Sequence, residues 1–169
     1  MPPAPPIRKF SLAFDAQEDR LAWDAEDLAG ATTRLWLTQR LCRGLVAAVL
    51  PRLQAAAPAD AAPRHAAAVQ SWEQAAAMSE FGKIAGVQPG PDAASGLVSA
   101  VHIRPTADGL ELKFDFGTDQ SRTVGVAHAG VRQMLAVMRR LYQAAGWPMD
   151  IWPDWVEPPT APPPADSVN

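Results

Sequence analysis

The chain has 169 residues, which is enough for one compact globule but too short for two independent mid-sized domains. Hydrophobic residues make up 48% and charged residues 20%, a balance typical of globular proteins. Its formal net charge of −3 provides no positive field for phosphates or anionic lipid, so we expect neither nucleic acid nor a membrane as a partner. No apolar stretch is long enough to cross a bilayer, which excludes a membrane-spanning helix.

The first patterned block, residues 7–54, is predicted to contain three strands and a helix. A proline-rich arm, residues 1–6, precedes it and is expected to be disordered. Apolar residues alternate with polar or small ones in the segments KFSLAF, RLAW and TRLWL, which is the period of half-buried strands. At Thr38 the period becomes helical, and the Thr38 hydroxyl is predicted to cap the first turn. Pro51 has no N–H, so the helix is predicted to end or kink near Leu50.

The second block, residues 55–96, is predicted to be a linker rich in alanine and proline that contains one helix. Asp60 is a candidate N-terminal cap, Pro63 suits the first turn, and Gly82 suits the position after the last turn. The helix has a narrow apolar face, which we expect to lie across the core. That face consists of Val69, Trp72 and Ala76.

The third block, residues 97–146, repeats the layout of the first. It has three alternating segments, LVSAVHI, LELKFDF and RTVGVA, and then an amphipathic helix that Gly146 is predicted to end. At an offset of 89 residues the two blocks align without a gap, with their apolar positions in register. This predicts an α+β fold of two antiparallel βββα units, for which internal duplication and chance similarity both stay open. We expect the units to cover their sheet faces with their helices or with each other.

The common catalytic sequence motifs do not occur in the chain, so no catalytic residue and no cofactor are predicted. Gly125 and Gly130 have the spacing of a phosphate-binding loop between a strand and a helix. However, Val131 and Arg132 stand where lysine and serine or threonine are required. We therefore interpret this segment as an ordinary strand-to-helix turn.

No metal site is predicted either. His65, His102 and His128 lack the spacing of metal ligands, and the acidic residues of the first hairpin are interpreted as a solvated edge, because Arg20 stands where a calcium loop needs glycine. Cys42, the single cysteine, excludes an intrachain disulfide and is expected to be a buried, unreactive thiol. These features, with no signal-peptide pattern, favour a cytoplasmic protein, and the abundance of Ala and Arg favours a bacterial source.

Three tryptophans stand close together in the segment 147–157, namely Trp147, Trp152 and Trp155. Two Trp-Pro pairs prevent a regular helix there and favour an extended strip. We expect this strip to cover apolar surface of its own chain or of an identical neighbour, because three exposed indoles would favour aggregation. Docking into the pockets of a partner is the alternative. The proline-rich tail that follows, residues 158–169, is expected to be disordered.

These observations favour a non-catalytic protein–protein interaction or assembly module that associates with itself or with a protein partner. The hypothesis rests on the aromatic strip, on exposed sheet edges and on the missing catalytic motifs. A second hypothesis stays open, in which the chain is a small-molecule-binding protein or an enzyme with a pocket between the two units. The candidate residues of that pocket are His102, His128 and Arg132.

Overall fold

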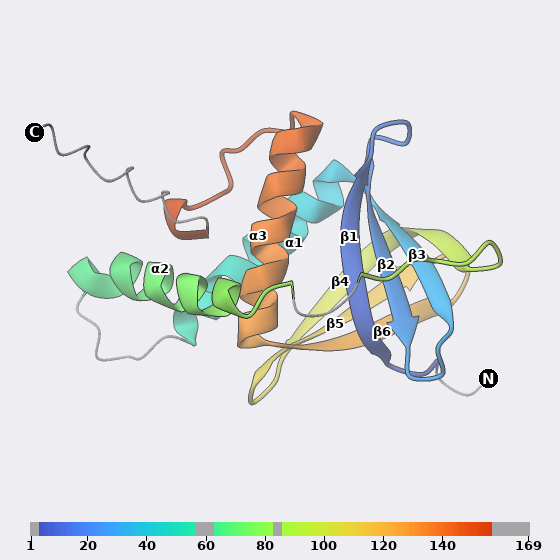
Figure 1. Cartoon of the computed structure of the whole chain (residues 1–169), viewed down its shortest axis with the longest axis horizontal. Helices are drawn as coiled ribbons and strands as arrows, with labels where there is room; N and C mark the ends of the chain where they lie inside the picture. The colour runs from blue at the N-terminus through green and yellow to red at the C-terminus, as the bar shows by residue number, and fades with distance from the viewer. Residues whose placement is uncertain (1–3, 57–62, 83–85, 157–169) are drawn as a thin grey trace, which may run out of the picture.

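Alternating apolar residues in both halves of the chain build a six-stranded mixed sheet (Figure 1). The structure is a computed structural model, and it describes residues 4–56, 63–82 and 86–156. The strands in this part of the chain are β1 (Ile7–Asp15), β2 (Arg20–Asp27), β3 (Thr32–Leu37), β4 (Ala94–Pro105), β5 (Gly109–Phe116) and β6 (Gln120–Ala127). They follow chain order across the sheet, and neighbours are antiparallel except β3 and β4, which are parallel.

Three helices and one 3-10 turn within the described residues gather on one side of the strands (Figure 1). They are α1 (Gln39–Ala55), α2 (Pro63–Ser79), α3 (His128–Ala145) and η1 (Asp154–Val156). The helix α2 packs against α3 and η1. The start of α3 follows that of α1 by 89 residues, and β5 follows β2 by the same 89. The chain is therefore a mixed α+β protein in which three strands and then a helix occur twice in order.

The sheet curls, so that the inner faces of its two halves meet in a shared core. In Figure 1 the strands of the first half cross in front of those of the second. The ring centroids of Trp23 on β2 and Phe114 on β5 lie 4.6 Å apart, and both side chains are fully buried. The curl also brings β1 close to β6, although these strands stand at opposite ends of the sheet order.

The predicted cap of α1 is confirmed, whereas the helix does not end near Leu50, one of the two outcomes predicted for Pro51. The backbone N–H of Leu41 donates to the Thr38 hydroxyl at 3.2 Å. The helix then continues through Pro51 to Ala55. Proline removes the hydrogen bond to the Ala47 carbonyl, and core packing beyond the proline offsets this loss. Leu53, two residues beyond Pro51, is 2% exposed and packs in the core.

The predicted inner face of α2 is also wrong. Trp72 is 77% exposed, while Gln70, Gln74 and Ala77 face inward. The buried Arg132 of α3 lies under α2, where Gln70 accepts from its guanidinium and Gln74 donates to its carbonyl, so the inner face of α2 is a polar contact. The helix ends at Ser79, three residues before Gly82, and the predicted cap Asp60 lies outside the described residues. Gly146, by contrast, ends α3 as predicted, with a φ of 69°.

Candidate functional site

The aromatic strip after α3 is anchored first by Trp147. This indole is 6% exposed, and its ring meets those of Phe14 and Tyr142 edge-on, with centroids 5.7 Å and 5.0 Å away. Its Nε1–H donates to Asp19 Oδ1 at 3.1 Å. Trp147 therefore joins α3 to the first hairpin of the sheet.

The other two tryptophans of the strip are buried as well. Trp152 meets the Tyr142 ring edge-on at 5.3 Å, and the Trp155 ring lies 5.3 Å from the guanidinium carbon of Arg132. Their exposed fractions are 9% and 7%. The structure thus places all three indoles against their own chain; whether this segment also contacts a partner stays a prediction.

An ion pair fastens the middle of the strip to α1. The guanidinium of Arg43 donates to both carboxylate oxygens of Asp150, at 2.9 Å and 2.5 Å. These hydrogen bonds lower the pKa of the Asp150 carboxyl. Because both side chains are exposed to solvent, the pair adds little stability and mainly fixes position.

Arg132 is the centre of a polar contact between α2 and α3. It is 3% exposed and donates to Gln70 Oε1 at 2.7 Å and to Glu73 Oε2 at 2.6 Å. The Gln74 side-chain amide donates to the Arg132 carbonyl at 3.0 Å. Burial lowers the pKa of the Arg132 guanidinium, while Glu73 opposes this shift. The guanidinium of Arg132 donates to residues of α2 within the same protein, so Arg132 links α2 to α3.

The three residues predicted for a small-molecule pocket do not come together. His128 and Arg132 line a depression of about 390 Å³ beside Glu73. His102 lines neither this depression nor the larger cavity described below. It lies exposed on β4, and its Nε2 is 2.7 Å from Asp115 Oδ2, a contact that lowers the pKa of the Asp115 carboxyl. Within the described ranges, no cluster of three or more His, Cys, Asp or Glu residues could hold a metal ion.

A larger cavity, of about 440 Å³, opens between β1 and β6. We call it the edge slot. Its walls are residues 8–12 of β1, residues 124–126 of β6 and, from the segment that follows α2, residues 80–82 and 86. Its floor is formed by α3 through Gly130, Met134 and Val137. Consecutive residues of a strand point to opposite faces of a sheet. Since consecutive residues line both strand walls, the slot exposes the edges of the two strands and not only one face.

The hydrogen-bond pattern of β6 shows which backbone groups point into the edge slot. The N–H of His128 donates to the Asp108 carbonyl at 3.0 Å, and the register between β5 and β6 continues without a shift from this pair. Hydrogen-bonded and non-hydrogen-bonded pairs alternate in an antiparallel ladder. The pair of Gly125 and Glu111 is therefore non-hydrogen-bonded, and the N–H and C=O of Gly125 point away from β5 toward the slot.

Neither strand beside the edge slot has a second strand partner in the part of the chain that the structure describes. The cations at its rim are already paired, because Arg8 and Lys9 both contact the Glu26 carboxylate. Their hydrogen bonds lower the pKa of the Glu26 carboxyl. Among the described residues, the slot therefore offers strand-edge backbone groups without a strand partner and apolar side chains more than it offers unpaired charge.

Sequence reasoning missed the edge slot, because a period of two does not tell how far a sheet will curl. One signal was present: Gly125 interrupts a predicted strand, and an isolated glycine in a strand often marks a close approach of another backbone. A Cβ placed at Gly125 would meet nothing within 4 Å. The glycine is therefore not required by packing within the described part of the chain.

Cys42 lies fully buried in the core, as predicted, and burial raises the pKa of its thiol to about 12. The segment from Gly125 to Gly130 runs from β6 directly into α3, as expected of a strand-to-helix turn.

Comparison with protein families, curated proteins and solved structures gives no match for this chain. In the described part of the chain, no helix has the length and apolar character needed to span a membrane.

Proposed function

We propose that this protein is a non-catalytic interaction module that binds an extended segment of a protein partner in the edge slot. The observation that carries the proposal is the backbone of Gly125, whose N–H and C=O point into the edge slot from a side of β6 that pairs with no other strand among the described residues. Extended peptides add to such edges through main-chain hydrogen bonds, while side-chain pockets provide specificity. The sequence led us to expect exposed sheet edges, and the proposal assigns binding to one of them, the edge of β6 at Gly125.

The chemistry of the edge slot favours a partner segment with alternating apolar side chains. Buried Val124 and Val126 flank Gly125, and Met134 closes the floor beneath them. A strand that pairs with β6 would direct every second side chain toward this floor. Since the cations at the rim already contact the Glu26 carboxylate, we expect apolar contact and backbone pairing to provide most of the affinity.

The test uses peptides selected from a random library against the full chain. Gly125→Pro removes the N–H that faces the edge slot, and proline is tolerated on edge strands. Gly125→Ala is the matched control, because its methyl group meets open space. The selected peptides are expected to bind the proline variant at least about tenfold more weakly, the effect of roughly 1.4 kcal/mol, and to bind the alanine variant as tightly as the parent. Equal binding to all three proteins, or failure to select any peptide, would contradict the proposal.

The size of the edge slot also favours a second candidate, a small apolar ligand. Its volume of about 440 Å³ falls within the range of small-molecule sites, roughly 300 to 1,000 Å³. Such a ligand would lie against Met134 and Val137 and would not use the Gly125 N–H. Titration with N-phenyl-1-naphthylamine, a fluorescent apolar probe, separates the candidates: tight binding that Gly125→Pro leaves unchanged supports the small ligand.

We also propose that the two βββα units arose by internal duplication. The proposal is supported by the common spacing of 89 residues between β2 and β5 and between the starts of α1 and α3. A crystal structure in which residues 9–50 and 98–145 differ in the faces that they bury would contradict it.

A further inference from the structure

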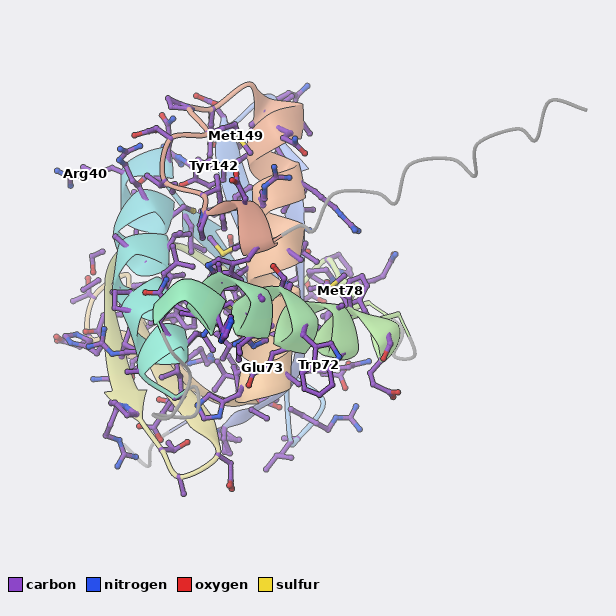
Figure 2. The ribbon with its side chains drawn as sticks, turned by 90° about the vertical axis from the view of Figure 1, so that its left-hand side faces the viewer. Arg40, Trp72, Glu73, Met78, Tyr142 and Met149 are labelled. Atoms are coloured by element: carbon purple, nitrogen blue, oxygen red, sulfur yellow. The ribbon has the colours of Figure 1, made fainter. Side chains whose placement is uncertain are left out.

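The outer face of α2 carries the most exposed large hydrophobic side chain of the described residues. Trp72 is 77% exposed, and Figure 2 shows its indole standing off the helix. The opposite face is already fixed to α3, through Gln70, Gln74 and Ala77. The indole therefore cannot turn inward without breaking these contacts, and its exposure is a consequence of how α2 is anchored.

The sequence of this outer face is nearly symmetrical about Trp72. Residues three and four positions away lie on the same side of a helix. On both sides of Trp72 these positions hold small or aliphatic residues, namely Ala68, Val69, Ala75 and Ala76. Ser71, the midpoint of α2, is the neighbour of Trp72. A second α2 in the antiparallel direction would therefore find the same surface, with room for its own indole over alanine.

The same face has almost no charge, although the protein as a whole is negative. Between residues 65 and 79 the one carboxylate is Glu73, and it pairs with the buried Arg132. Two copies of the chain would repel each other through their net charge of −3 each. An uncharged helix face lets them approach without placing like charges in contact.

We propose that α2 is a self-association helix, against which the α2 of a second copy packs in the antiparallel direction with the two-fold axis beside Trp72. A two-fold interface needs a patch that is complementary to itself, and the symmetry about Trp72 provides one. This inference does not depend on the edge slot, because the residues on either side of Trp72 line no wall of that cavity.

The patch on α2 is small for a protein–protein interface. The stretch from His65 to Ser79 is about 22 Å long at 1.5 Å per residue, on a helix about 10 Å wide. This is well below the roughly 800 Å² per partner of a standard stable interface. We therefore expect the dimer to be weak and reversible.

Sedimentation equilibrium of the full chain over a concentration series tests the association. The full chain is expected to show a monomer–dimer equilibrium, and Trp72→Ala is expected to weaken the dimer at least about tenfold, because tryptophans buried at interfaces are common hot spots. Leu28→Ala is the control, since Leu28 is also an exposed large apolar residue, at 65%, but lies in the turn between β2 and β3. A chain that stays monomeric at every concentration, or a dimer that Trp72→Ala leaves unchanged, overturns the proposal.

Disulfide cross-linking tests the antiparallel geometry. An axis beside Trp72 places Ala68 of one copy opposite Ala76 of the other, and a disulfide requires Cα atoms about 4.4 to 6.8 Å apart. A mixture of Ala68→Cys and Ala76→Cys proteins is therefore expected to form cross-linked dimers faster than either variant alone. The native Cys42 does not compete, because it is fully buried. Cross-linking that is as fast in each variant alone as in the mixture would overturn the antiparallel arrangement.

Discussion

At the scale of single residues, burial decides the chemistry of the one thiol and of the buried arginine. Cys42 lies among apolar side chains, and its pKa is raised to about 12 because the thiolate would lose its hydration. Arg132 stays buried because Glu73 and Gln70 accept its hydrogen bonds. Both residues are therefore better explained as parts of the folded structure than as reactive groups.

The raised pKa of Cys42 makes the free energy of unfolding depend on pH in the alkaline range. The thiol ionises near pH 9 in the unfolded chain and near pH 12 in the folded one. Between these values the folded state holds the extra proton, so the free energy of unfolding is expected to fall as pH rises, by up to about 1.4 kcal/mol per pH unit. Urea unfolding at pH 8 and pH 10 measures this fall. Cys42→Ala should lose less stability over the same interval, and an identical loss in both proteins would contradict the buried thiol.

At the scale of elements, local signals predicted the strands, the Thr38 cap and the end of α3 at Gly146, whereas contacts between distant elements decided the rest. Thr38 was predictable because a cap depends on its own first turn. The course of α1 beyond Pro51 depends on Leu53, which the core buries. The orientation of α2 depends on Arg132, which stands about sixty residues away in the sequence. Apolar periodicity alone could not predict that two glutamines would face inward.

Trp152 in the strip after α3 and Trp72 on the outer face of α2 differ sharply in burial. Trp152 is 9% exposed and packs on Tyr142, whereas Trp72 is 77% exposed. Trp152→Ala is expected to lower the free energy of unfolding by about 3 to 5 kcal/mol, and Trp72→Ala to change it by less than about 0.5 kcal/mol. Chemical denaturation at low protein concentration measures both. Similar small effects for the two variants would mean that the strip serves something other than its own fold.

At the scale of the whole molecule, the curl of the sheet creates the candidate binding site. The sequence predicted the two sets of strands, but it did not predict that the edges of β1 and β6 would approach each other, because this depends on the packing of Trp23 against Phe114 across the core. The edge slot and the α2 face lie on different surfaces of one protein. If both proposals hold, each copy of a reversible dimer can bind its own partner segment.

Hydrogen exchange at the backbone of β6 tests the edge slot most directly, because it needs no partner. The N–H groups of Val124 and Val126 belong to hydrogen-bonded pairs with β5, while that of Gly125 points into the slot. In the free full chain the Gly125 amide is expected to exchange much faster than its two neighbours, and a peptide selected for binding is expected to slow it. A Gly125 amide that is protected as strongly as Val124 and Val126 in the free protein would contradict an open edge at this position.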